Sequence, residues 1–402
     1  MSKYTVSLKD VIQKPLSGEW GDTEGETNVI RTTNFTNDGK LNLTEVVKRN
    51  IETKKISQKQ LIYGDTIIEK SGGSPSQPVG RVVYFDQKKD VFLCNNFTSV
   101  IRAKPEIDSR YLFWFLFNNH LTQNTLKYQN KTTGIINLQL ERYINELQIP
   151  LQPMPIQKHI AEILDAADAL KRKDQELLKK YDELAQAIFI DMFGDPVKNE
   201  KGWEVKKLGD YISVLTDYHS NGSYETLREH VTLRNVPDHA LMVRTTDLEK
   251  NNFTDNVNYI SKEAYEHLDK SKIFGGEIII NKIGSAGNLY LMPFLNRPVS
   301  LGMNAFLVRL NESLNPVFAF HFLNTDFGKN EISKRVFGAV TKTITKDAVR
   351  SIPMFKIPRK EQELYVECIT YIKSLINCGN ALQSDLLFQT LLQKAFKGEL
   401  VE

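Results

Sequence analysis

The stretch that decides the fold is IQKHIAEILDAADALKRKDQELLKKYDELAQAI, residues 156–188. Its apolar residues are spaced alternately four and three apart, which is the a/d pattern of a coiled-coil helix. The stripe consists of Ile156, Ile160, Ile163, Ala167, Leu170, Asp174, Leu177, Tyr181, Leu184 and Ile188. Asp174 is its one polar member, and a polar residue at such a position often sets the register of paired helices. We therefore expect one long helix at the centre of the chain.

A second stripe with the same spacing lies near the end of the chain, 205 residues further on. Its members are Tyr365, Cys368, Ile372, Leu375, Gly379, Leu382 and Leu386. Gly379 occupies the position that Asp174 has in the first stripe. Two such stripes in one chain are most simply buried against each other, so we expect the two helices to form an antiparallel coiled coil.

The composition is that of a soluble globular protein: 402 residues, 41% apolar and 25% charged. The net charge of +3 permits nucleic-acid binding without requiring it. No apolar run approaches the roughly 20 residues that span a bilayer, and the N-terminus has no signal-peptide pattern, so we expect a cytoplasmic protein. Three cysteines form no CxxC pair and seven histidines form no metal-ligand motif, so no metal site is predicted.

The segments that precede the two helices resemble each other. Six motifs recur in the same order, namely 6–12 with 205–212, 29–35 with 242–248, 63–74 with 275–285, 111–118 with 317–324, 133–134 with 337–343, and 148–150 with 351–353. A repeat of this length is a duplicated domain-plus-helix unit, since solenoid repeats are much shorter. We predict an α+β protein with a pseudo-two-fold arrangement: a domain over 1–149, a helix over 150–196, a second domain over 197–352 and a helix over 353–402.

Candidate nucleic-acid contacts are small polar loops that carry a lysine or an arginine. They are Arg31, Thr32, Thr33, Lys70, Ser71, Gly72, Lys131 and Thr132 in the first segment, and Arg244, Thr245, Thr246, Lys282, Gly284, Ser285, Lys342 and Thr343 in the second. Arginine can fork onto guanine, hydroxyls reach phosphates or bases, and glycine lets backbone N–H groups approach phosphate. Ordinary turns would show the same residues. The aromatic runs 111–117 and 317–322 could stack on bases, but buried core helices are the favoured interpretation.

No catalytic constellation is present in the sequence. It lacks a GxxxxGK[ST] phosphate loop, a GxSxG nucleophile elbow, and the Asn/Asp-Pro-Pro-aromatic tetrapeptide of amino-methyltransferases. We therefore predict no catalytic residues. Clusters of Asp and Glu formed only on folding would escape this search, so a nuclease or a methyltransferase with unrecognised motifs stays as the alternative.

Three motifs together resemble the DNA specificity subunit of Type I restriction–modification systems. IPLQPMPIQKHIAEIL at 149–164 is similar to the family's Ile-Pro-Leu-Pro-Pro-Leu-x-x-Gln lead into its conserved helix. MFGDP at 192–196 resembles the end of that helix, and KAFKGEL at 394–400 resembles the family's C-terminal ending. Gln152 departs from the pattern, where the family has proline, and the second junction, 353–358, lacks adjacent prolines. The duplicated architecture extends the resemblance to the whole chain.

The resemblance implies a non-catalytic subunit with two target-recognition domains, each reading one half of a bipartite DNA site. The helices would set the spacer and dock two methyltransferase subunits, with restriction subunits joining the full complex. S-adenosylmethionine, ATP and Mg²⁺ would be bound by those partners and not by this chain. A coiled-coil adaptor without a nucleic-acid role is a further alternative that the residues leave open.

Overall fold

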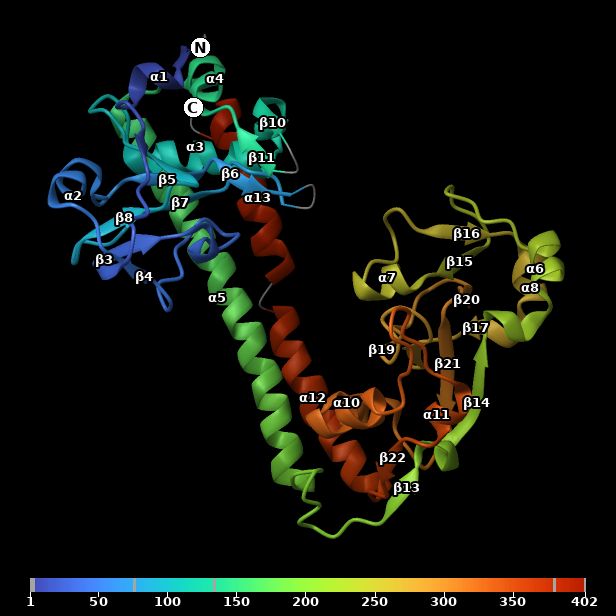
Figure 1. Cartoon of the computed structure of the whole chain (residues 1–402). Helices are drawn as coiled ribbons and strands as arrows, with labels where there is room; N and C mark the ends of the chain where they lie inside the picture. The colour runs from blue at the N-terminus through green and yellow to red at the C-terminus, as the bar shows by residue number, and fades with distance from the viewer. Residues whose placement is uncertain (1–3, 75–76, 133–134, 379–380, 401–402) are drawn as a thin grey trace. The chain divides into compact units, whose positions relative to one another are not determined.

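The computed structural model describes residues 4–74, 77–132, 135–378 and 381–400. It divides into two compact units, one formed by Met1–Leu177 with Asn380–Glu402 and the other by Leu178–Gly379. Helix α5 (Met154–Phe193) is continuous through the boundary between them, as Figure 1 shows. Within the described residues, no helix is both long enough and apolar enough to cross a membrane.

The domain in the first unit is built on short sheets. One sheet has the order β2 (Leu16–Ser17), β9 (Thr98–Ile101), β5 (Thr66–Glu69), β7 (Val82–Tyr84). Two others are β4 (Val47–Arg49), β3 (Glu24–Ile30), β8 (Phe92–Cys94) and β10 (Gln129–Thr132), β11 (Ile135–Leu138), β6 (Ser71–Gly73). Strands β5, β7, β8 and β9 are buried along their whole length. β1 (Thr5–Ser7) pairs with β12 (Gln148–Pro150). The helices are α1 (Leu8–Val11), α2 (Thr53–Lys59), α3 (Ser109–Leu121) and α4 (Leu140–Glu146).

The domain in the second unit repeats this plan. Its sheets are β14 (Ile212–Asp217), β21 (Ala305–Leu310), β18 (Ile278–Asn281), β19 (Leu289–Leu291) and β16 (Asn258–Ile260), β15 (Ala240–Val243), β20 (Val299–Leu301), β17 (Lys272–Ile273). β13 (Val205–Lys207) pairs with β22 (Pro353–Phe355). The helices are α6 (Tyr224–His230), α7 (Thr245–Glu249), α8 (Lys262–His267), α9 (Pro316–Asn324), α10 (Asp326–Ser333) and α11 (Lys346–Arg350). The predicted α+β class is confirmed.

The aromatic runs form core helices. Every residue from Tyr111 to Phe117 in α3 is buried, and α9 buries Phe318 and Phe322. Both helices begin at a capping side chain, because Asp108 accepts hydrogen bonds from the first turn of α3 and Asn315 does the same for α9. The buried rings have no free face for a base, so stacking is excluded for the run 111–117 and for Phe318 and Phe322, whereas Phe320 is half-buried.

A buried glutamine ties each domain to the long helix that follows it. Gln157 accepts the N–H of Asp108 (2.8 Å) and donates to the carbonyls of Glu106 (3.1 Å) and Gln152 (2.7 Å). Gln362 makes the same three contacts in the second unit. Its partners are Asn315, Ser313 and Ile357, at 2.8, 3.1 and 2.8 Å. The duplicated glutamine explains why the domain–helix junction recurs in the sequence.

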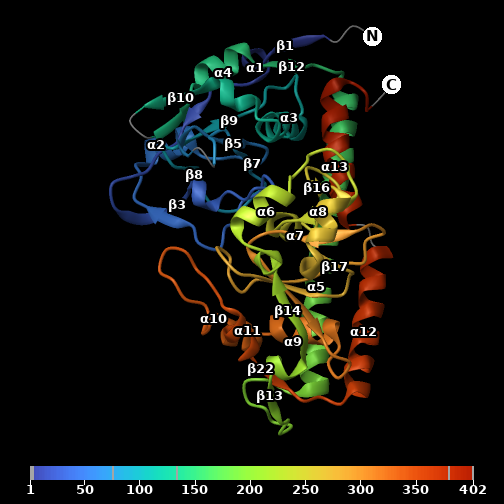
Figure 2. The same cartoon turned by 90° about the vertical axis from the view of Figure 1, so that its right-hand side faces the viewer.

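Two helices pack along α5, each within its own unit. α13 (Ala381–Lys397) buries Phe388 and Leu392 in the cluster that contains Ile160 and Leu164 of α5, and it lies along this half of α5 in both views (Figures 1 and 2). In the second unit, α12 (Arg359–Cys378) packs Tyr365 against Phe189 of α5, with 5.6 Å between ring centroids. The predicted C-terminal helix is therefore described as two helices, on either side of residues 379–380.

The buried face of α5 differs from the predicted stripe. Ile160 and Ala167 are buried as expected, whereas Leu170, Leu177 and Leu184 are 45%, 39% and 45% exposed. Ile163, Asp174, Tyr181 and Ile188 are half-buried. The reason is that α5 packs against α3 and α9 as well as against α13 and α12. The buried side of α5 is therefore the one that carries Ala161, Leu164 and Phe189.

The second stripe shows the same shift. Tyr365 and Ile372 are buried, Cys368 is half-buried, and Leu375 and Leu386 are exposed, while Ile369, Phe388 and Leu392 are buried in their place. The predicted seam is therefore wrong at Leu375 and Leu386. Gly379 and the side chain of Leu382 lie outside the described residues.

Candidate nucleic-acid interface

The topology of the first domain brings two of the predicted loops to one edge. β3 and β8 are parallel, so the chain leaves both strands at the same end, and the N–H of Asn95 donates to the carbonyl of Ile30, beside Arg31. β5 and β9 are antiparallel, so the end of β5 adjoins the start of β9, and the N–H of Lys70 donates to the carbonyl of Phe97. Arg31 and Lys70 therefore flank the turn 95–97.

The second domain assembles its loops in the same way. β15 and β20 are parallel, and the N–H of Gly302 donates to the carbonyl of Val243, beside Arg244, at 2.7 Å. The N–H of Lys282, which follows β18, donates to the carbonyl of Asn304 at 2.7 Å. The turn 302–304 thus corresponds to 95–97, and Arg244 and Lys282 correspond to Arg31 and Lys70.

The third predicted loop joins this edge in both domains. β11 pairs with β10, which contains Lys131 and Thr132, and also with β6, which contains Ser71. The side chains of Lys131 and Thr132 lie outside the described residues. In the second domain, Gly284 donates its N–H to the carbonyl of Lys342 at 3.0 Å, and Thr343 forms a β-bridge with Ile283. Loops that are about 60 residues apart in sequence therefore meet.

The two corresponding lysines differ in their partners. Lys70 Nζ donates to Ser17 Oγ at 2.7 Å, and burial lowers the pKa of Lys70. Lys282 Nζ lies 2.9 Å from Asp217 Oδ2, and Lys346 Nζ lies 3.3 Å from Asp217 Oδ1. Burial alone would raise the pKa of Asp217, but the hydrogen bond from Ser220 and the two ammonium groups outweigh it and lower that pKa to about 2.

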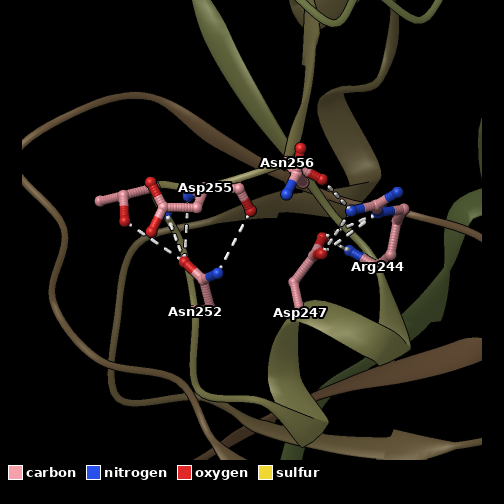
Figure 3. Close-up of polar contacts among 6 residues, drawn as sticks. Arg244, Asp247, Asn252, Asp255 and Asn256 are labelled. Atoms are coloured by element: carbon pink, nitrogen blue, oxygen red, sulfur yellow. Dashed lines mark hydrogen bonds and ion pairs between the residues drawn. The ribbon is translucent and has the colours of Figure 1, made fainter. Parts of the chain in front are cut away.

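The two corresponding arginines also differ. Arg244 forks onto Asp247, with Nη2 at 2.6 Å from Oδ1 and Nε at 3.0 Å from Oδ2, and Nη2 also donates to the carbonyl of Asn256 at 2.6 Å (Figure 3). The hydrogen bond with Asp247 raises the pKa of Arg244. The matching position in the first domain is Asn34, so Arg31 has no such carboxylate, and among the described residues its Nε is buried without a partner.

The loop that follows α7 supports Arg244 from the other side. Asn252 Oδ1 accepts the N–H groups of Thr254 (3.1 Å) and Asp255 (3.0 Å), and Asn252 Nδ2 donates to the carbonyl of Asp255 (Figure 3). This ring of contacts holds the segment that carries Asn256. In this structure Arg244 therefore links the start of α7 to the segment that carries Asn256.

The remaining predicted residues are small and partly exposed. Thr33 and Thr246 are exposed, while Thr32 and Thr245 are half-buried. The hydroxyl of Ser71 bonds to Asn137, and that of Ser285 donates to Glu249 at 3.1 Å. Gly72 and Gly284 have φ angles of 98° and 82°, a backbone conformation that favours glycine, and a Cβ at either would meet nothing within 4 Å. Gly72 lies in β6 and Gly284 in a bend, and both have open space beside them.

Sequence reasoning missed the turns 95–97 and 302–304. Each is a three-residue link between two buried strands that belong to different sheets. The signal was present as two short apolar runs separated by NNF in one segment and by GMN in the other. In the described part of the chain, no group of three or more His, Cys, Asp or Glu side chains is placed to hold a metal ion.

Comparison with protein families decides what these two domains are. The model of the Type I restriction modification DNA specificity domain matches residues 2–180 and again residues 200–385. The chain belongs to this family. Each match covers one of the two domains with part of the long helices that follow it, and the expected specificity subunit with two target-recognition domains is confirmed.

Relatives and solved structures agree with this membership. The putative type I restriction enzyme MjaX specificity subunit of Methanocaldococcus jannaschii is 23% identical over 84% of this chain and 79% of its own length. The MjaVIII specificity subunit of the same organism is 24% identical over 83% and 79%. The crystal structure of a Type I S subunit from M. genitalium shares the fold, with a TM-score of 0.56 at 14% identity, over 98% of this chain and 96% of that one. A second structure, described as concerning complex assembly and conformational transition of the type I R-M system, has a TM-score of 0.51 at 16% identity, over 99% and 98%.

Proposed function

We propose that each domain of this specificity subunit reads one half of a split site in double-stranded DNA. The observation that carries the proposal is the duplicated edge, where an arginine, a lysine and a glycine-containing loop meet beside a short turn in both domains. Such an edge supplies cations and backbone N–H groups for phosphates, and hydroxyls for base edges. Two similar but non-identical edges suit a site with two non-identical halves.

The long helices supply the second part of the proposal, an antiparallel coiled coil related by a pseudo-two-fold axis that sets the spacer between the half-sites. α5 has 40 residues, which at 1.5 Å per residue is about 60 Å. One turn of B-DNA is about 34–36 Å long. Inserting seven residues in each helix is expected to lengthen the non-specific spacer and leave both half-site sequences unchanged, as methylome sequencing would detect. Altered half-sites would contradict this role.

The exposed leucines of α5 support docking of partner proteins. Leu170, Leu177 and Leu184 recur every seven residues on a face that the rest of the described chain leaves open. Leu364 and Tyr371 repeat this spacing on α12. Seven-residue apolar stripes pair with other helices. The partners proposed are two methyltransferase subunits, joined by restriction subunits in the full complex, and these partners would bind S-adenosylmethionine, ATP and Mg²⁺.

Docking can be tested on the helix surface itself. Leu177→Glu together with Leu184→Glu is expected to leave the thermal unfolding of the chain unchanged, because both side chains are exposed, and to abolish co-purification with the methyltransferase subunits. Gln175→Glu, an exposed neighbour on α5, is the matched control and is expected to bind normally. Normal binding by the double-leucine variant would show that the partners dock elsewhere.

The function as a whole is tested by methyl transfer and by the salt dependence of DNA binding. Methylation of DNA is expected from the chain combined with its methyltransferase subunits; methylation by the chain alone would favour the alternative of a DNA-modifying enzyme. The affinity for duplex DNA is expected to fall steeply with salt concentration, because neutralised phosphates release counterions. A flat response would favour an adaptor that does not bind nucleic acid.

A further inference from the structure

The turns 95–97 and 302–304 each present one large apolar side chain to solvent. Phe97 is 44% exposed, and Met303 is 49% exposed. Isolated apolar residues are common on protein surfaces, so exposure alone decides little. What distinguishes these two is their position, because each lies in the link that the predicted contact loops of its own domain surround.

Main-chain hydrogen bonds hold the first turn in place. The carbonyl of Phe97 accepts the N–H groups of Lys70 (2.9 Å) and Ser71 (3.2 Å). At the other end of the turn, Thr98 donates from its N–H (3.0 Å) and its hydroxyl (2.8 Å) to the carbonyl of Asn95. The side chain of Phe97 therefore projects from a fixed backbone. These hydrogen bonds, and not contacts of the Phe97 ring, keep this residue beside the loop that contains Lys70.

The second turn is held by the same main-chain pattern. Lys282 donates its N–H to the carbonyl of Asn304, and Gly302 donates to the carbonyl of Val243, both at 2.7 Å. Asn304 has a φ of 70°, in the left-handed region that asparagine tolerates better than most residues. This tight turn points Met303 outward one residue earlier than Phe97 in the first domain. Each domain thus has an exposed apolar side chain in the turn that links its two sheets, on a backbone that hydrogen bonds hold in place.

We propose that Phe97 and Met303 are base-contacting residues, each making the apolar contact within its own half-site. The inference rests on the proposed function. Apolar side chains in the major groove contact the 5-methyl group of thymine, which cytosine lacks. The surrounding loops would bind phosphates and fix the depth of approach, and the turn would bring one apolar group to the base edges.

The test is a selection from a double-stranded DNA library with a randomised central segment. It uses the full-length chain in complex with its methyltransferase subunits. Phe97→Ala is expected to reduce discrimination about ten-fold at one or two base pairs of one half-site and to leave the other half unchanged. Met303→Ala is expected to do the reverse. Ile62→Ala and Phe274→Ala are matched controls: these residues are 49% and 66% exposed and precede β5 and β18, whereas Lys70 and Lys282 follow them.

Each outcome decides a different point. A consensus that is unchanged in both variants, or changed in both halves by either one, would overturn the assignment of Phe97 and Met303, as would an equal effect of the control substitutions. A wild-type complex that enriches no sequence would overturn the proposed function itself. Equal thermal unfolding of all variants separates a lost base contact from a lost fold.

Discussion

The two domains share their internal frame and differ at their loops. Asp65 binds Arg102 in the first domain, as Glu277 binds Arg309 in the second, at corresponding positions of the paired strands. The buried glutamine at each helix start is equally duplicated. At the loops, in contrast, a lysine that binds a serine hydroxyl in the first domain is held by a carboxylate in the second.

This difference separates residues that hold the fold from residues free to change function. The frame contacts are buried and satisfy backbone groups, so losing one leaves a polar atom unpaired. The loop contacts lie at the edge, where solvent or DNA can replace a lost partner. Substitutions at the frame should therefore destabilise both domains, whereas substitutions at the loops should affect the two domains differently.

The largest effect is expected from removing the frame arginines. Arg102→Ala leaves the fully buried Asp65 without its two 2.8 Å contacts, at a cost of about 3–5 kcal/mol. Arg309→Ala should cost less, about 2–3 kcal/mol, because Glu277 keeps the N–H groups of Phe274 and Gly275, whereas Asp65 keeps that of Ile62. Urea unfolding followed by hydrogen-exchange mass spectrometry reports on each domain separately.

A double variant provides the control for that pair. Asp65→Asn with Arg102→Met removes both charges, and it should recover part of the loss because no unpaired buried charge remains. An Arg102→Ala domain as stable as the wild type would mean that the ion pair contributes nothing to the frame.

Next in size is the loss of the junction glutamines. Gln157→Ala and Gln362→Ala each remove three hydrogen bonds from a buried site and should each cost about 2–4 kcal/mol, equally in the two domains. Gln175→Ala on the exposed face of α5 should change stability by less than about 0.5 kcal/mol. Urea midpoints compare the three variants, and unequal costs at the two junctions would break the equivalence of the frames.

At the loop lysines, a pH-dependent stability term is expected from Asp217, the partner of Lys282 in the second domain. The pKa of Asp217 is lowered to about 2 in the folded chain, against about 3.9 for a free aspartate. A lowered pKa stabilises the fold above the unfolded value, so about 2 kcal/mol is present above about pH 4 and is lost as the pH falls toward about 2. Asp217→Asn should abolish this term in urea unfolding measured across that range, whereas Ser17 supplies no such titration to the first domain.

The smallest effect is expected from exchanging the loop partners. Ser17→Asp would give Lys70 a carboxylate and should reduce the slope of log affinity against log salt by about one, as one phosphate contact is lost. Asp217→Ser would release Lys282 and should increase that slope by about one. Binding to duplex DNA titrated over a range of salt concentrations measures both, and unchanged slopes would place these lysines away from DNA.

The sequence correctly predicted features that depend on neighbouring residues, such as the ends of strands. The ends of β3, β5, β15 and β18 follow from apolar runs that stop at a polar turn, so Arg31, Lys70, Arg244 and Lys282 were located correctly at strand ends. The partner of Arg244 was also within reach, because Asp247 follows three residues later and Asn34 replaces it in the other copy.

The parts that could not be predicted depend on contacts between distant segments. A seven-residue period shows that a helix is striped, but the packing of α3 and α9 against α5 decides which side is buried, and this left Leu170 exposed. The sequence match also placed α3 and α9 in a register that is wrong by one residue. It aligned Tyr111 with Val317, whereas the N-terminal caps Asp108 and Asn315 align Tyr111 with Phe318. The turns 95–97 and 302–304 could not be predicted, because each links strands of two different sheets and the pairing of those strands depends on distant segments.

The way these turns are held bears on how the protein can evolve. Their anchors are mainly backbone N–H and carbonyl groups, which every residue except proline supplies alike. Side-chain identity at positions such as 97 and 303 is therefore nearly neutral for folding. A single nucleotide change there could drift through a population without harming the protein, and each such change would offer a new recognition variant on an unaltered scaffold.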